Sequence, residues 1–156
     1  MDTLEELRKQ RAELDKKIEE LEFEECHYKD GDEYYTVDIG GLVNRGTWDD
    51  FLFERRAFYQ GNILPTKQEA ELESERRKLL HRFKMFRDRC NGEWKNNFYI
   101  EQRHYYIDFY NSEDVLFTDS TFFKSFDLFG YFKNESDCDK AIELFGDEIK
   151  RLYVEV

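Results

Sequence analysis

The sequence predicts a mixed α+β protein, and three observations carry that prediction. Leucines in a heptad-like pattern fill the first 25 residues, which is typical of an amphipathic helix. Short segments rich in Tyr, Phe, Val and Ile follow, and they alternate as strands do. Two of these segments lead directly into helix caps. We therefore expect an N-terminal coiled-coil-like helix over residues 1–29 and an α+β domain over residues 30–156, with two strand-to-helix units packed on a common antiparallel sheet.

The first helix carries a narrow apolar seam with alternating steps of three and four residues. Its members are Leu4, Leu7, Arg11, Leu14, Ile18 and Leu21. Lys17 and Glu22 are five residues apart, a spacing that allows pairing across a parallel dimer. The seam covers about two and a half heptads, which is marginal for a free helix in water. Two interpretations stay open: a weak parallel homodimer with Arg11 at a buried position, or a helix lying on its own domain.

The first strand-to-helix unit is expected to begin after Asp30-Gly31, which would end the first helix. Residues 34–39 alternate as a strand, and the Gly40-Gly41 turn leads into a partner strand that closes at Trp48. Residues 49–60 carry no clear pattern, and a loop with a short strand is expected over residues 58–64.

A helix is predicted from Thr66 to about Arg89, ending at Asn91-Gly92, because Thr66 and Glu69 have the spacing of a capping box. Its expected buried stripe comprises Leu72, Leu79, Leu80, Phe83 and Phe86.

The second unit repeats this scheme. Strands are expected over residues 98–100, 105–110, 115–117 and 128–132. Asn134 and Asp137 then repeat the cap-and-acid pattern and open a helix that Gly146 is expected to break. The eight residues 63–70 and 131–138 share one order of strand, connecting residue, N-cap, two polar residues, acid and small residue.

Composition limits the class of protein. The chain has 156 residues, a net charge of -12 and an aromatic share of 17 %, so we expect one compact domain with a ring-filled core. The three cysteines form no CxxC motif, the N-terminus lacks the composition of a secretory signal, and no apolar stretch is long enough to span a membrane. These features predict a soluble cytoplasmic protein. The negative charge argues against direct nucleic-acid binding.

Several segments resemble a family of small accessory proteins encoded by phages and prophages of Gram-positive bacteria. The matching residues are Gly46-Thr47-Trp48, residues 61–71, Tyr105-Tyr106-Ile107, Tyr131-Phe132-Lys133-Asn134 and residues 144–149. Pro65 departs from the family, where Phe or a polar residue is expected. The resemblance covers most of the chain and implies a phage accessory role, with counter-defence such as anti-CRISPR activity a prominent function.

No catalytic or cofactor motif is present. Phosphate-binding glycine loops are absent, and the three histidines and three cysteines do not have zinc-ligand spacing. No local pattern marks a nucleophile with a His and an acid. We therefore expect no enzyme activity, no metal and no cofactor.

Two candidate binding sites remain. The first is an acidic run of Glu19, Glu20, Glu22, Glu24 and Glu25, which could imitate a phosphate backbone; the alternative is a solvated helix face. The second is a basic and aromatic site of Arg82, Lys84, Arg87, Tyr105 and Tyr106, which could stack nucleobases; the alternative is a ring-filled core. The stretch from Arg76 to Arg89 holds seven basic residues and a single acid, Asp88.

These features predict a non-catalytic inhibitor that covers a surface of a host defence factor, such as a CRISPR-Cas nuclease. Two alternatives stay open: a sponge that sequesters a nucleotide second messenger, and a coiled-coil adaptor protein. The expected partners are this host protein and a second copy of the chain, with no membrane.

Overall fold

The computed structural model describes residues 3–98 and 101–155. Within them, the predicted α+β class and the N-terminal helix are confirmed. In chain order the elements are α1 (Leu4–Glu24), β1 (Glu33–Val37), β2 (Val43–Thr47), α2 (Leu52–Tyr59), α3 (Lys67–Asn91), β3 (His104–Tyr110), β4 (Val115–Thr121), α4 (Glu135–Ile149) and the π-helix η1 (Lys150–Val154).

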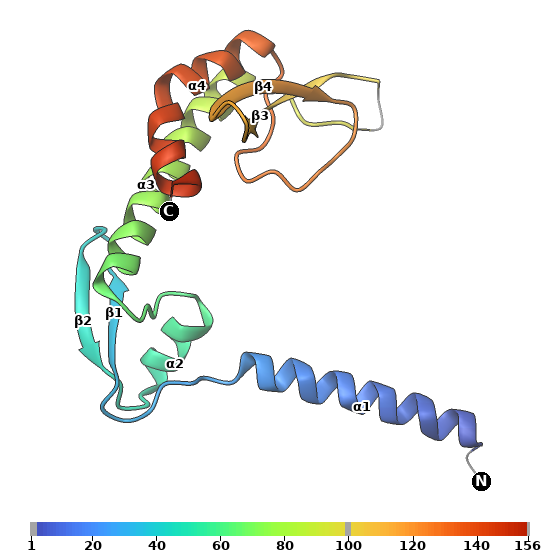
Figure 1. The fold of residues 1–156 in the computed structure, drawn as a ribbon, viewed down its shortest axis with the longest axis vertical. Helices are drawn as coiled ribbons and strands as arrows, with labels where there is room; N and C mark the ends of the chain where they lie inside the picture. The colour runs from blue at the N-terminus through green and yellow to red at the C-terminus, as the bar shows by residue number, and fades with distance from the viewer. Residues whose placement is uncertain (1–2, 99–100, 156) are drawn as a thin grey trace.

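The long helix α3 joins two lobes and gives the molecule the shape of a C (Figure 1). One lobe contains β1, β2 and α2, and the other contains β3, β4, α4 and η1. Helix α3 packs on β1 and β2 in the first lobe, and on α4 and η1 in the second. Helix α1 extends away from the first lobe and forms the lower arm of the C.

The first hairpin joins β1 and β2 in antiparallel register, with Tyr34 opposite Gly46. The ring of Tyr34 lies across this glycine, where an added Cβ would come within 2.5 Å of the ring. Only glycine leaves space for that ring, which explains the Gly46-Thr47-Trp48 motif. A third segment extends the hairpin at Leu64, which exchanges two 2.9 Å backbone hydrogen bonds with Tyr35. The chain then enters α3 through Thr66, whose side chain accepts the Glu69 N–H.

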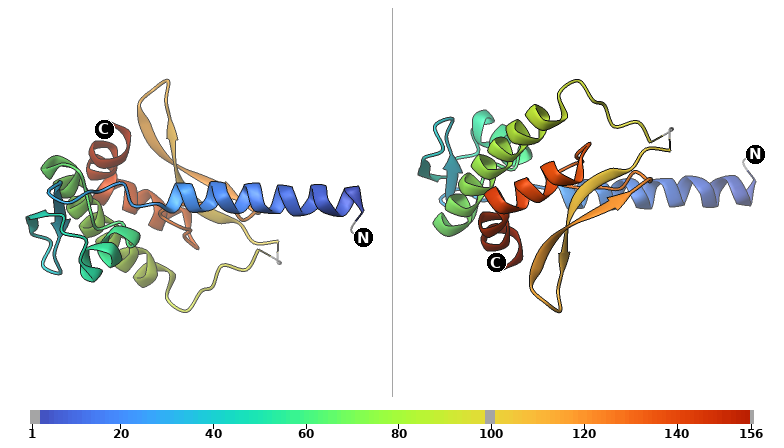
Figure 2. Two further views of the ribbon diagram at one scale, coloured as in Figure 1. Left: turned by 90° about the horizontal axis from the view of Figure 1, so that it is seen from below. Right: turned by 90° about the horizontal axis from the view of Figure 1, so that it is seen from above.

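The second hairpin repeats this arrangement with β3 and β4. Phe132 exchanges two backbone hydrogen bonds with Tyr105, at 2.7 and 3.1 Å, and the chain enters α4 through Asn134. This hairpin is long and twisted and packs against α4, as the two views of Figure 2 show.

The two units also agree in the burial of several equivalent positions, although the Asn134 side chain makes no cap hydrogen bond of the kind that Thr66 makes. Tyr34 and Val37 are the buried positions of β1, and His104 and Ile107 are buried with the same spacing in β3. Ala70 and Cys138, each four residues beyond its N-cap, are both fully buried. The shared scheme seen in the sequence thus corresponds to two similar strand–strand–helix units.

The expected common sheet is wrong. Within the described residues the strands form two separate two-stranded sheets, one in each lobe. Helix α3 lies between the lobes, and the strands of one hairpin never meet those of the other.

The strand expected over residues 128–132 is a turn, with only Phe132 in a β-bridge. The Asp127 carboxylate accepts the N–H groups of Phe129 and Gly130, both at 2.9 Å, and so folds the chain back. Gly130 has a φ of +71°, and an added Cβ would come within 2.4 Å of the Arg87 guanidinium. The strand expected over residues 98–100 falls where residues 99 and 100 lie outside the described part of the chain.

Two helix boundaries differ from expectation, and one helix was not predicted. Helix α1 ends at Glu24, before Asp30-Gly31, because its last turn gathers acids at the negative end of the helix dipole and contains no basic residue. Helix α2 occupies part of the stretch that showed no pattern. Gly146 does not break α4: it is buried where α4 meets β4, and this packing offsets its low helix propensity of about 1 kcal/mol.

Each lobe has its own core. Phe83 of α3 is the centre of the second core, with ring contacts to Phe129, Phe132 and Phe145 at centroid distances of 4.8–5.8 Å. Leu79 is fully buried beside it, as predicted, whereas Leu72, Leu80 and Phe86 are half-buried. The second core also buries Cys138, and this burial raises the pKa of the thiol to about 11.

The first core is smaller and is built around Tyr34, Trp48 and Ile63. Glu54 of α2 is buried beside it, and its carboxylate accepts hydrogen bonds from the Tyr34 hydroxyl and from the N–H groups of Asp49 and Phe51 at 2.8–3.1 Å. Three donors satisfy a buried carboxylate, which explains how Glu54 is tolerated inside. Burial and the bond to Glu54 raise the pKa of Tyr34 to about 12.

Candidate interaction surfaces

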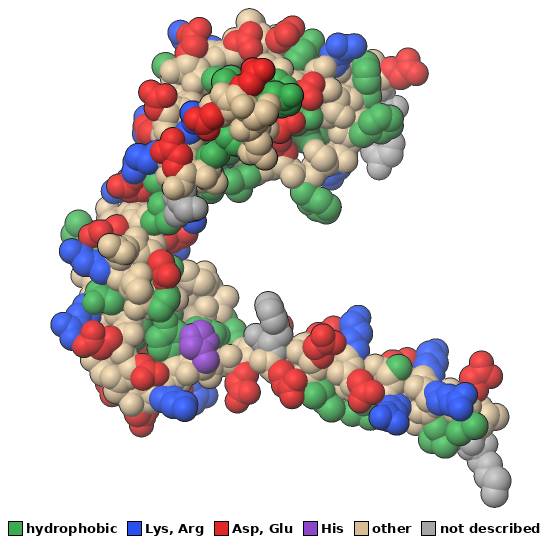
Figure 3. All heavy atoms as spheres, in the orientation of Figure 1, with side chains coloured by type: hydrophobic (Ala, Val, Ile, Leu, Met, Phe, Trp, Pro, Cys, Tyr) green, Lys and Arg blue, Asp and Glu red, His purple; other side chains and the backbone are tan. Residues whose placement is uncertain are grey.

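The apolar seam of α1 is uncovered. The helix begins at a capping box in which the Thr3 N–H donates to the Glu6 carboxylate and the Glu6 N–H donates to the Thr3 hydroxyl. From there on, the leucines and the isoleucine of the seam are 48–66 % exposed. Figure 3 shows hydrophobic side chains mostly along the lower edge of α1, with charged side chains over the rest of the visible face and some on the same edge. The interpretation of α1 as a helix lying on its own domain is therefore wrong.

The acidic run occupies the last turns of α1 and the residue that caps it. All five glutamates are exposed. Among the described residues, Glu20 is the one member with an ion pair, to Lys16 at 3.7 Å. The run lies at the negative end of the helix dipole, so it destabilises its own helix. This position favours a cationic partner that the described chain does not supply.

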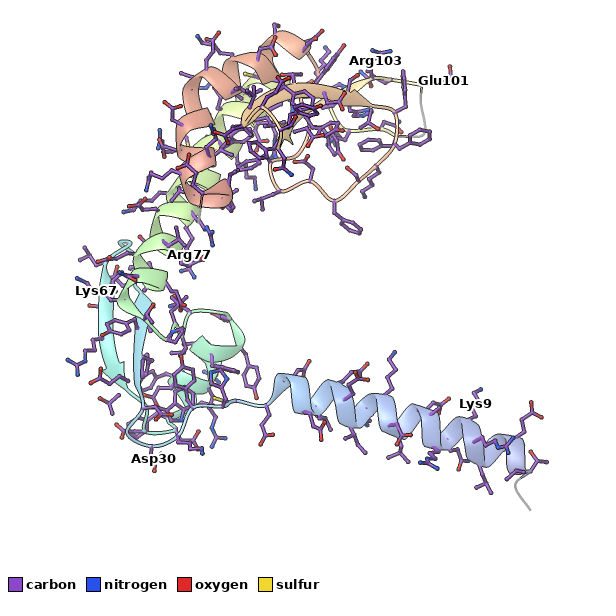
Figure 4. The ribbon with its side chains drawn as sticks, viewed as in Figure 1. Lys9, Asp30, Lys67, Arg77, Glu101 and Arg103 are labelled. Atoms are coloured by element: carbon purple, nitrogen blue, oxygen red, sulfur yellow. The ribbon has the colours of Figure 1, made fainter. Side chains whose placement is uncertain are left out.

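The basic stretch of α3 is engaged mostly in contacts within the chain. Arg76 donates to the Leu152 carbonyl oxygen and lies over the Tyr153 ring. Arg77 bonds Glu73 and Asn62, and Figure 4 shows it on α3 between the two lobes. These arginines tie α3 to its neighbours.

Within the predicted basic and aromatic site, the residues are divided among several internal contacts. Arg82 binds Glu148 at 2.9 Å, and Arg87 donates to the Phe129 carbonyl oxygen and to Asp88. Tyr105 packs on the second core, and the Tyr106 hydroxyl donates to Asp119. Lys84 is exposed and borders a hollow of 170 Å³.

Sequence reasoning missed two exposed aromatic surfaces. One is at the start of α2, where Phe51, Leu52 and Phe53 are each more than half exposed and the two Phe rings stack at 5.7 Å. The other is the loop after β4, where Phe123 and Phe126 are almost fully exposed. This loop hangs from the second lobe on the concave side of the C (Figure 1). The available signal was the density of aromatic residues. The sequence offered a ring-filled core as one explanation of the rings after residue 98, and residues 49–60 showed no pattern.

A hollow of 460 Å³ lies where α1 joins the first lobe. Tyr28 and Trp48 stack on its inner wall with centroids 5.4 Å apart, and Arg55 and Asp50 form an ion pair at its rim. The remaining lining residues include Cys26, a free thiol. The mixture of rings and charges suits a polar peptide segment as well as a small molecule, so the hollow defines no chemistry by itself.

His104 has the most unusual environment of the three histidines. It is fully buried, stacked on Phe98 at 4.0 Å and flanked by Trp94 and Tyr131. Neither ring nitrogen has a hydrogen-bond partner. The imidazole therefore serves as a ring in an aromatic cluster and does not reach solvent. Among the described residues, no group of three His, Cys, Asp or Glu side chains is arranged to hold a metal ion.

Comparison with protein-family models, curated proteins and solved structures finds no match to this chain. Across the described residues, no helix is both long and apolar enough to cross a membrane.

Proposed function

We propose that this chain is a non-catalytic binding protein that inhibits a partner by covering a nucleic-acid-binding surface. The observation that carries the proposal is the acidic run at the end of α1, exposed and almost without partners in its own chain. The resemblance to phage accessory proteins indicates the partner class: a host defence factor in the bacterial cytoplasm, such as a CRISPR-Cas nuclease.

The charge density of the run supports mimicry of a nucleic acid. Five carboxylates lie between Glu19 and Glu25, which span about 9 Å of helix axis at a rise of about 1.5 Å per residue. Five charges over that length are about 2.3 Å apart on average, which lies between the ≈ 1.7 Å per charge of duplex DNA, counted over both strands, and the ≈ 3.4 Å per charge of one strand. A groove lined with Arg and Lys for phosphate would accept these carboxylates with little rearrangement.

The exposed rings would supply the apolar part of such an interface. Aromatic residues are enriched at the centres of protein interfaces, where they contribute most of the binding energy. The surface at Phe51 and Phe53 and the loop with Phe123 and Phe126 lie on the two lobes. A partner seated in the concave side would be held by contacts on both lobes and be steered by the acidic arm.

The test is capture of a host protein from a lysate of defence-positive bacteria by the immobilised chain. Wild type should capture a nucleic-acid-binding protein, with capture falling steeply as salt rises and as duplex DNA is added. The E19K/E20K/E22K variant should lose most of this capture. Helix content should not fall, because lysines suit the C-terminal end of α1.

The matched control reverses three exposed acids elsewhere. E93K/D108K/E113K changes the net charge by the same amount and should capture as wild type does. Equal loss in both triple variants would mean that total charge matters and would contradict mimicry. In the sponge alternative, reversal of Arg82 and Lys84 would abolish binding of a nucleotide second messenger, and the glutamates would have no effect.

A further inference from the structure

The seam of α1 is an apolar surface that no described residue of its own chain covers. Its five aliphatic side chains are about half exposed or more, and every other described side chain of α1 is exposed as well. Most of the stability of a helix in a protein comes from packing of its amphipathic face, and the described side chains of α1 have no such packing within the chain. A second helix with a matching seam would supply it.

We propose that this second helix is α1 of another copy of the chain, and that the two run antiparallel. In this orientation Leu4 packs against the partner's Leu21, Leu7 against the partner's Ile18, and Arg11 against the partner's Leu14. All six seam positions are used once, and the pairing is symmetric, as a twofold dimer requires. The proposal does not depend on the proposed function.

Arg11 is the first reason to prefer the antiparallel orientation. A parallel pairing aligns identical positions, so it would place the two Arg11 guanidinium groups in one layer of the interface. An antiparallel pairing moves them into adjacent layers, each against an aliphatic side chain. Arg11 also keeps its own counter-ion, because its Nε atom lies 3.6 Å from Asp15 at the edge of the seam.

The acidic run is the second reason. In a parallel dimer the two runs would lie side by side, with five glutamates on each helix. In an antiparallel dimer each run faces the partner's N-terminus, which holds Glu5 and Glu6 but also the positive end of the helix dipole. The antiparallel orientation therefore has the smaller electrostatic repulsion.

The flanking charges make the two orientations distinguishable. In the antiparallel pairing Arg8 lies beside the partner's Asp15, and symmetry produces this contact twice. In the parallel pairing Arg8 lies beside Thr3, and the charged contact joins Lys17 to the partner's Glu22. Charge reversal of Arg8 should thus weaken the antiparallel dimer, and charge reversal of Lys17 should weaken the parallel dimer.

The antiparallel dimer would carry its two bodies at opposite ends of the paired helices, with an acidic run beside each body. Such an arrangement presents two copies of each binding surface facing apart. It would favour partners that are themselves dimeric or repeated, since two linked contacts raise the apparent affinity.

The test is sedimentation equilibrium of the full chain over a concentration series that reaches the millimolar range. Wild type should approach twice its 19.1 kDa mass. R8E should weaken the dimer roughly tenfold, because two attractive contacts become repulsive. The double variant R8E/D15R should dimerise more tightly than R8E, because the introduced glutamate again faces a cation, but more weakly than wild type, because Arg11 loses Asp15 as its counter-ion. K17E should resemble wild type.

Three outcomes would overturn the proposal. A chain that stays monomeric at every concentration leaves the seam without its proposed partner. A dimer weakened by K17E and not by R8E is parallel. An assembly of another stoichiometry pairs the seam in some other way.

Discussion

Tyr34 links the first hairpin to α2 through one hydrogen bond, and that bond makes stability depend on pH. The phenol donates to the buried Glu54 carboxylate at 3.1 Å, and its pKa is raised to about 12. An unfolded chain loses the same proton near pH 10. The contribution of Tyr34 is therefore fully present below pH 10 and is lost as pH rises toward 12, by about 2–3 kcal/mol in the free energy of unfolding.

Urea denaturation between pH 9 and pH 12 measures this loss, with Y34F as the comparison. Burial also raises the pKa of Tyr28, Tyr106 and Tyr153, so wild type alone would not isolate Tyr34. Y34F should be less stable than wild type at neutral pH, since Glu54 loses a donor. Above pH 10 the two curves should converge. Parallel curves would show that Tyr34 ionises equally in both states.

Among the helices and strands, α3 is the one that packs on both lobes, so the stability of both should depend on it. Phe83 is 1 % exposed and contacts three rings of the second core. F83A should lower the free energy of unfolding by about 3–5 kcal/mol, from lost burial and from the cavity left behind. Chemical denaturation of F83A and wild type measures this difference in the free energy of unfolding.

Labelling of the Cys138 thiol provides an independent readout of the same variant. In wild type this thiol is fully buried and its pKa is raised to about 11, so it should resist alkylation. F83A should speed labelling through increased opening of the core. A loss below about 1 kcal/mol without faster labelling would mean that Phe83 is not a core residue.

The helices differ in how far the sequence predicts them, and capping explains the difference. Helix α3 follows from Thr66 and from Gly92, which has a positive φ at the C-terminal end. Helix α2 has no such signal, because its start is held by the side chain of Glu54. Its apolar residues are also divided: Leu52, Phe53 and Tyr59 face outward, whereas Ala57 and Phe58 pack on the first core. Periodicity detects helices with a buried face, so a helix with exposed rings is missed.

The strands show a different limit. Runs of β-forming residues and the turns between them located β1, β2, β3 and β4, yet they did not reveal that the hairpins stay apart. Local pattern fixes which residues can form strands, whereas pairing between distant strands depends on tertiary packing. The same limit applies to the candidate sites. The sequence alone predicted the acidic run, whereas the aromatic surfaces could be found only from the fold, which shows which rings remain exposed.

The whole molecule is a curved body of two similar lobes with a detached arm. The body holds both hydrophobic cores, and none of the described side chains of α1 belongs to either. The arm holds an uncovered seam and the acidic run. We infer that α1 pairs with a second copy of the chain and attracts the partner protein electrostatically. The two lobes then contact that partner through the aromatic surfaces.

The most direct test of this account is the solution mass of the chain with and without residues 1–25. Both cores stay intact in the truncated chain, so it should fold, with the circular dichroism of the remaining elements retained. We predict that the full chain approaches a dimer as concentration rises and that the truncated chain remains a monomer at every concentration. The same mass in both would contradict it, because association would then come from the body and α1 would have no partner to explain its exposed seam.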